Sequence, residues 1–161
     1  LAFDYSGSAG APCLWVVVDR IDSNRDAKRL WLFQPPLQPK QTLAQVTRVL
    51  EDGSFQVQPN PHGPSLRGRF AHPQPTTVQT QPLKYEYTKN WGNNRGTKET
   101  VQVNALSVPG TDHFFFIGTV SAGEHPPVTI QGQGLDAVIT IGRRTIRFDG
   151  QKIVLGTAPA R

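Results

Sequence analysis

The sequence predicts an all-β fold, an antiparallel multi-stranded β-sandwich, on three observations. First, 14 prolines and 15 glycines interrupt the 161 residues every few positions, which favours short elements joined by turns. Second, no window of about ten residues keeps apolar side chains at the i, i+3, i+4 spacing of an amphipathic helix. Third, the apolar residues occur in short alternating or continuous runs between turn signals, which is the pattern of sandwiches and barrels.

The two most apolar runs are LWVVVDRID at residues 14–22 and HFFFIGTV at residues 113–120. Both are shorter than the roughly 18–20 residues that a membrane span needs. Their β-branched and aromatic residues favour strands over helices. Continuous apolar runs of this kind are typical of central strands that are covered on both faces. We therefore expect these two runs at the centre of a domain that packs sheet against sheet.

Turn residues divide the rest of the chain into further strands. The predicted strands are residues 13–21, 28–34, 45–50, 54–59, 65–72, 76–80, 83–88, 100–107, 112–121, 128–133, 135–141, 143–149 and 151–156. Asp52 and Gly53 can supply the positive φ angles of a tight hairpin turn. Gly142 and the pair Asp149-Gly150 join the last three strands into a meander.

The final meander shows the clearest alternation. Ile139 and Ile141 fall on one face of their strand, and Ile146 and Phe148 alternate with Arg147. Because successive side chains of a strand point to opposite faces, this sheet is expected to have one dry face and one wet face.

Length and cysteine content indicate one domain without internal disulfides. We expect a single β-sandwich over residues 1–156 and a frayed tail at residues 157–161. The single cysteine, Cys13, excludes an internal disulfide framework. The chain contains no methionine and shows no signal-peptide pattern at its start. We interpret it as a mature product, a fragment or a cut domain.

The charge balance is modestly basic, with 17 Lys and Arg against 12 Asp and Glu, for a net charge of +5. The basic residues are scattered, without the dense block of a nucleic-acid-binding arm. The excess favours anionic partners such as acidic polysaccharide. A plain solvated basic surface is the alternative interpretation.

Motifs that carry catalysis or bind metals do not stand out. The four histidines are His62, His72, His113 and His125, and none belongs to a metal-binding pair such as HxH or HExxH. No nucleophile elbow, phosphate-binding loop or dinucleotide-binding motif is present. Cys13 has no histidine nearby in sequence, so we interpret it as an inert thiol. We therefore predict no catalytic residue, no metal ligand and no cofactor within this chain.

One segment has the composition of a carbohydrate-binding turn. In YEYTKNWGNNRG, residues 85–96, aromatic side chains interleave with amides and cations. Sugar rings need an apolar face to stack on, amides for their hydroxyls and a cation for a carboxylate or sulfate. We predict carbohydrate-binding residues at Tyr87, Trp91, Asn94 and Arg95. The alternative is an ordinary turn with Trp91 folded back onto the core.

Six segments taken in order resemble the C-terminal β-sheet domain of heparinase II/III-like polysaccharide lyases. They are LWVVVDRID, RLWLFQPPLQP, SLRGRFAHPQPTTVQ, LKYEYTKNWGN, TDHFFFIGTVSAG and VITIGRRTIRFDG, and together they cover nearly the whole chain. The chain departs from the family where LFQ stands in place of LLH and where a terminal tyrosine is missing.

The resemblance implies a function for the larger protein. In that family an N-terminal α/α toroid supplies the catalytic residues, and early β strands supply further histidines and, in some members, a zinc site. The chain would then be the later part of the β region of a secreted or periplasmic enzyme. That enzyme would degrade uronic-acid-containing polysaccharide, such as glycosaminoglycan or alginate, by β-elimination. The implied partners are acidic polysaccharide and the toroid with the early β portion, as a missing segment or a second chain, without nucleic acid or membrane.

Two other functions stay open on sequence grounds. A stand-alone carbohydrate-binding β-sandwich needs no catalytic groups, and the net positive charge and the segment around Trp91 agree with it. A purely structural or assembly domain requires neither.

Overall fold

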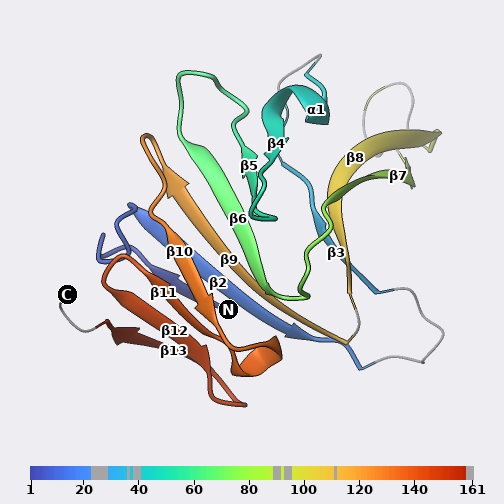
Figure 1. Ribbon diagram of the computed structural model, residues 1–161. Coiled ribbons are helices and arrows are strands. Elements are labelled where there is room, and N and C mark those ends of the chain that lie inside the picture. The colour runs from blue at the N-terminus through green and yellow to red at the C-terminus, as the bar shows by residue number, and fades with distance from the viewer. Residues whose placement is uncertain are drawn as a thin grey trace.

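A computed structural model describes residues 1–22, 29–35, 37, 41–88, 92, 96–110 and 112–158. Three antiparallel sheets make up most of the described chain, so the all-β, sandwich-like prediction is confirmed (Figure 1). The strands are β1 (Ala2–Asp4), β2 (Cys13–Arg20), β3 (Arg29–Phe33), β4 (Thr47–Val49), β5 (Phe55–Val57), β6 (Ser65–His72), β7 (Gln79–Thr88), β8 (Lys98–Gly110), β9 (His113–Ser121), β10 (Val128–Gln131), β11 (Val138–Ile141), β12 (Arg144–Phe148) and β13 (Ile153–Thr157). Two short helical turns are α1 (Leu43–Val46) and η2 (Gly134–Asp136).

The central sheet has six strands in the order β1-β2-β9-β6-β5-β4. Strands β2 and β9 pair from Cys13 opposite Val120 to Arg20 opposite His113. These are the two most apolar runs of the sequence, and they occupy the interior of the sheet as predicted. A second sheet, β10-β11-β12-β13, covers one face, and a third, β3-β8-β7, covers part of the other.

The face toward the four-stranded sheet carries a mostly aliphatic core, which we call the aliphatic core. Its fully buried members include Leu14, Val16, Phe115, Ile117, Ile139, Ile141 and Ile146. The alternation predicted for the final meander is confirmed, because Ile139 and Ile141 are buried while Val138 is exposed.

The face toward the three-stranded sheet carries what we call the aromatic core. Its rings belong to Trp15, Trp31, Phe33, Phe55, Phe70, Phe114 and Phe116. Trp31 stacks on Phe116 with ring centroids 4.7 Å apart. A Cβ at Gly68 would lie 2.5 Å from the Phe55 ring and 2.7 Å from the Phe116 ring. The aromatic core therefore depends on the bare backbone at Gly68.

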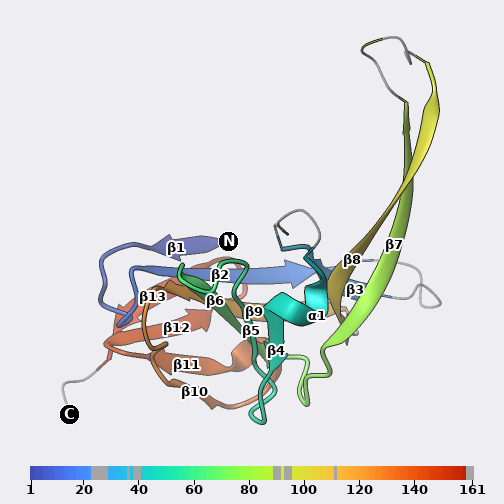
Figure 2. The same ribbon diagram turned by 90° about the horizontal axis from the view of Figure 1, so that it is seen from above.

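Strands β7 and β8 form a long hairpin that leaves the body of the domain (Figure 2). Residues 76–80 and 83–88 were predicted as two strands, whereas one strand runs from Gln79 to Thr88 through Pro82. The prediction failed because β7 is an edge strand, where a proline can sit without removing an interior ladder hydrogen bond.

Four further elements differ from the sequence prediction. The helical turn α1 takes in residues 45 and 46 of the strand predicted at residues 45–50, because the Thr42 N–H donates to Gln45 Oε1 at 2.8 Å in a capping box, and the strand β4 follows at Thr47–Val49. The 3-10 turn η2 replaces the start of the strand predicted at residues 135–141. Strand β1 was not predicted, and β13 ends at Thr157, inside the tail that was expected to fray.

Candidate functional site

Of the predicted carbohydrate-binding segment, residues 85–96, the structure describes the end of β7 to Thr88, Gly92 and Gly96. Tyr87 is 40% exposed, and its hydroxyl donates a hydrogen bond to Glu99 Oε2 at 2.7 Å. Trp91, Asn94 and Arg95 lie outside the described residues. Binding by these four residues therefore stays a prediction.

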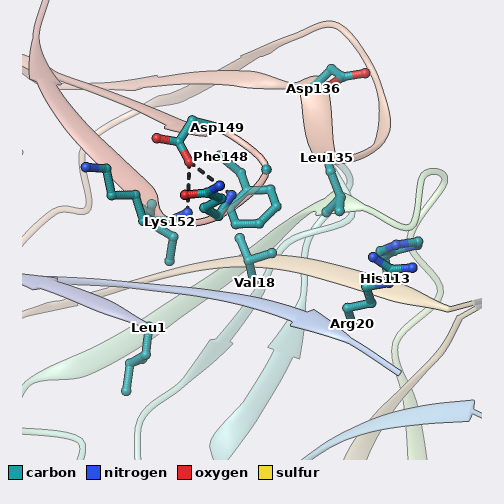
Figure 3. A pocket seen from close by; sticks show the side chains of 12 residues that line it. Leu1, Val18, Arg20, His113, Leu135, Asp136, Phe148, Asp149 and Lys152 are labelled. Atoms are coloured by element: carbon teal, nitrogen blue, oxygen red, sulfur yellow. Dashed lines mark hydrogen bonds between the residues drawn. The ribbon is translucent and has the colours of Figure 1, made fainter. Parts of the chain in front are cut away.

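A groove of about 580 Å³ opens between the central sheet and the turn joining β12 to β13 (Figure 3). Its lining comes from parts of the chain that are far apart in sequence: Leu1, Val18, Arg20, His113, Leu135, Asp136 and residues 148–153. We call this the β12–β13 groove.

The floor of the groove is apolar. Val18, Leu135, Phe148 and Ile153 are partly buried and pack against the aliphatic core. Figure 3 shows the Phe148 ring between the β12–β13 turn and Val18. The floor is therefore a solvent-accessible part of the aliphatic core, which a ligand with an apolar face can contact.

Arg20 and His113 form one wall. They are register partners on the adjacent strands β2 and β9, so their side chains project side by side from the same face of the sheet. His113 Nδ1 lies 2.7 Å from Asp112 Oδ1. The His72 ring lies beyond it, with centroids 6.5 Å apart. A guanidinium and an imidazole thus stand side by side at the rim (Figure 3).

The opposite wall is the β12–β13 turn. Asp149 Oδ1 accepts hydrogen bonds from the N–H groups of Lys152 at 2.8 Å and Gln151 at 3.0 Å. These bonds, that of Lys152 first, lower the pKa of Asp149, so its carboxylate stays ionised at neutral pH. The turn is thereby fixed, and it places Lys152 and Gln151 beside the groove.

The groove combines donors, acceptors and an apolar floor. Such a lining suits a ligand that has a carboxylate, hydroxyls and an apolar ring face at once. In the part of the chain that the structure describes, no three His, Cys, Asp or Glu side chains converge to hold a metal ion.

A second polar cluster surrounds His125 in the β9–β10 loop. Its Nε2 lies 2.8 Å from Ser65 Oγ, and its Nδ1 lies 2.8 Å from Thr119 Oγ1. Burial, followed by the nearby charge of Arg67, lowers the pKa of His125 and favours the neutral ring. The pair resembles a serine nucleophile with its base, but Ser65 is only 4% exposed, and the other ring nitrogen contacts the Thr119 hydroxyl instead of a carboxylate. The cluster therefore fastens the loop to the central sheet.

Comparison with known proteins gave no match to a family model, to a curated protein or to a solved structure. The resemblance to heparinase II/III-like lyases accordingly stays a prediction from sequence motifs. None of the helices in the described part of the chain has the length and apolar character of a membrane span.

Sequence reasoning missed the β12–β13 groove. The sequence analysis noted Arg20 only as one of several scattered basic residues. It noted His113 only as a histidine outside any metal-binding motif. Their positions in the sequence could have indicated a site. Arg20 follows one of the two apolar runs and His113 begins the other, so each lies where a buried strand reaches solvent.

Proposed function

We propose that this chain is a non-catalytic β domain that binds acidic polysaccharide in the β12–β13 groove. The observation that carries the proposal is the pairing of Arg20 and His113 beside the apolar floor around Phe148. In keeping with the sequence resemblance, the domain would be the later part of the β region of a heparinase II/III-like lyase that is secreted or periplasmic.

The chemistry of a uronate matches the groove part by part. The carboxylate would pair with Arg20, because guanidinium–carboxylate hydrogen bonds are charge-assisted and directional. The apolar face of the sugar ring would lie against Phe148. Hydroxyls, which both donate and accept, would meet Asp149, Gln151 and the ammonium of Lys152.

Within such a lyase the chain would hold the polymer while other parts perform the reaction. β-elimination needs a neutralised carboxylate, a base for the C5 proton and an acid for the leaving oxygen. In this proposal the domain itself supplies none of these groups. The toroid of the same enzyme would supply them.

A structural or assembly role is the second candidate, and the β7–β8 hairpin favours it. Hairpins with little core of their own are marginally stable in water. The outer face of the three-stranded sheet exposes Leu32 at 44% and Tyr87 at 40%. A partner covering this face would stabilise the hairpin.

Isothermal titration with uronate oligosaccharides, from alginate and from heparin, tests the binding proposal. Arg20→Ala is expected to weaken binding about tenfold or more, because a charge-assisted hydrogen bond contributes about 1.5–3 kcal/mol. Arg48→Ala is the matched control, since Arg48 is also an exposed arginine on a strand of the central sheet but lies outside the groove.

Three results would overturn the proposal. They are absence of binding, equal weakening by the two arginine variants, and equal affinity for neutral oligosaccharides of the same length. Equal weakening would indicate general attraction to a basic surface.

A further inference from the structure

Strand β1 carries exposed aromatic side chains that the groove does not account for. Leu1, Phe3 and Tyr5 are 73%, 50% and 71% exposed. They occupy alternate positions along an extended segment, so they share one side of it. The rings of Phe3 and Tyr5 are stacked, with centroids 6.0 Å apart and planes only 11° from parallel.

This aromatic pair lies on the sheet face opposite the four-stranded sheet. Phe3 is the register partner of Trp15, which packs into the aromatic core. Between these exposed residues, Ala2 and Asp4 turn to the other side, where Ala2 packs against the aliphatic core. β1 is an edge strand, so Phe3 and Tyr5 stand at the rim of the sheet.

The segment behind the pair is fixed. Arg144 Nε donates to Asp4 Oδ2 at 2.6 Å, and the Asp4 side chain is only 6% exposed. The Ser6 N–H donates to Asp4 Oδ1 at 2.9 Å. The Arg143 N–H donates to the Ser8 carbonyl at 2.8 Å. β1 and the residues after it are therefore tied to the four-stranded sheet on one side while they present two rings to solvent on the other.

We propose that Phe3 and Tyr5 form a stacking platform for sugar rings of the polysaccharide that occupies the β12–β13 groove. Adjoining exposed apolar side chains that form one patch mark contact sites more often than single exposed ones do. Two nearly parallel, exposed rings held on a fixed segment offer apolar ring faces on which the C–H face of a pyranose can stack.

Continuity with the groove selects a polysaccharide as the occupant. Leu1 is one of the residues that line the groove, and it is also the first of the three exposed side chains along β1 and its two flanking residues. Figure 3 shows Leu1 apart from Arg20 and His113. A chain with its carboxylate at Arg20 would pass Leu1 and continue over the sheet edge to Phe3 and Tyr5. A disaccharide in the groove would not reach the platform.

This inference rests on the proposed function and adds a dependence on chain length. Wild-type protein should bind long uronate oligosaccharides more tightly than the disaccharide, because only the long chains contact both surfaces. The double variant Phe3→Ala/Tyr5→Ala should lose about three- to tenfold in affinity for long chains, the contribution expected of aromatic contacts. Its affinity for the disaccharide should stay unchanged.

Titration of wild type and variants with alginate disaccharide and with long alginate oligosaccharides tests the inference. Val49→Ala, at an apolar residue 57% exposed on the opposite edge strand β4, is the control for loss of exposed apolar surface. Tyr5→Phe should keep the gain with length, because it keeps the ring.

The outcomes separate this inference from the proposed function. Disaccharide binding without a gain for long chains, or a gain that survives in the double variant, overturns the platform alone. Absence of disaccharide binding overturns the proposed function and the platform with it. Concentration-dependent self-association that the double variant abolishes would show that the rings contact a second copy, which also overturns the platform.

Discussion

The aromatic core and the aliphatic core share strand β9, yet different interactions hold the outer sheet to the central sheet in each. Ring contacts predominate in the aromatic core, and hydrogen bonds and an ion pair supplement burial at the aliphatic core. Phe114 and Phe116 project into one core and Phe115 and Ile117 into the other, so a single apolar run serves both. The aromatic core is a network of ring contacts in which Phe116 meets the rings of Trp15, Trp31, Phe55 and Phe70.

An ion pair and several hydrogen bonds surround the aliphatic core. Arg144 pairs with Asp4, and Arg69 donates to the Val128 carbonyl at 2.9 Å. His125 bridges Ser65 and Thr119 in the loop that leads into β10. The four-stranded sheet is thus positioned by directional bonds as well as by burial. That is the sheet whose β12–β13 turn forms a wall of the groove.

The largest expected effect is on the aromatic side. Phe116→Ala removes a fully buried ring that contacts several others, and it should lower the free energy of unfolding by about 3–5 kcal/mol. Urea denaturation followed by tryptophan fluorescence measures the change. A loss below about 1 kcal/mol would show that the rings do not hold the three-stranded sheet to the body.

The second prediction tests the ion pair between Arg144 and Asp4 beside the aliphatic core. The hydrogen bond from Arg144 lowers the pKa of Asp4 from 3.8 to about 2, against the opposing effect of burial. A carboxyl whose folded pKa is depressed stabilises the fold above its unfolded pKa, and this stabilisation is lost as pH falls from about 4 to about 2. Asp4→Asn should therefore cost about 2 kcal/mol at pH 7.

The pH profile provides the control for Asp4. Wild type and Asp4→Asn should converge in stability near pH 2, where the wild-type carboxyl takes up its proton. A constant difference from pH 7 to pH 2 would show that packing of the side chain, and not its charge, accounts for the loss.

A smaller effect is expected inside the aliphatic core. Ile139→Val removes one buried methyl group and should cost about 0.5–1.5 kcal/mol by urea denaturation. Val138→Ala, at a neighbour 38% exposed, is the matched control and should change stability less. Equal losses at the two positions would contradict the assignment of the dry face.

The smallest effect concerns His125, whose pKa is lowered from 6.5 by burial and then by Arg67. Because the unfolded chain binds the proton more readily, this contribution to stability is complete above about pH 6.5 and declines as pH falls below it. His125→Gln should flatten the decline measured between pH 7 and pH 5. An unchanged slope in the variant would show that other groups cause it.

Local patterns predicted the layers of this fold well. The continuous run at residues 113–120 indicated burial on both faces, and Gly142 and Gly150 marked the turns of the last sheet, where both have positive φ. The T-L-A-Q capping box at residues 42–45 was also readable, but the β-branched residues after it favoured a strand. These features depend on neighbours in sequence.

The parts that were missed depend on distant neighbours. β1 has three residues and is fastened by an ion pair across 140 positions, from Asp4 to Arg144. The groove likewise brings Arg20 to the turn at Asp149 and Lys152. Periodicity cannot reveal such pairings, because it carries no information about which strands lie side by side.

The most direct test of the account is an NMR titration of isotopically labelled protein with alginate disaccharide. We expect the largest backbone shift changes at Arg20, His113 and the β12–β13 turn, with little change at β4 and β5. Shifts confined to the β7–β8 hairpin, or no shifts at saturating ligand, would contradict the claim that this groove binds acidic sugar.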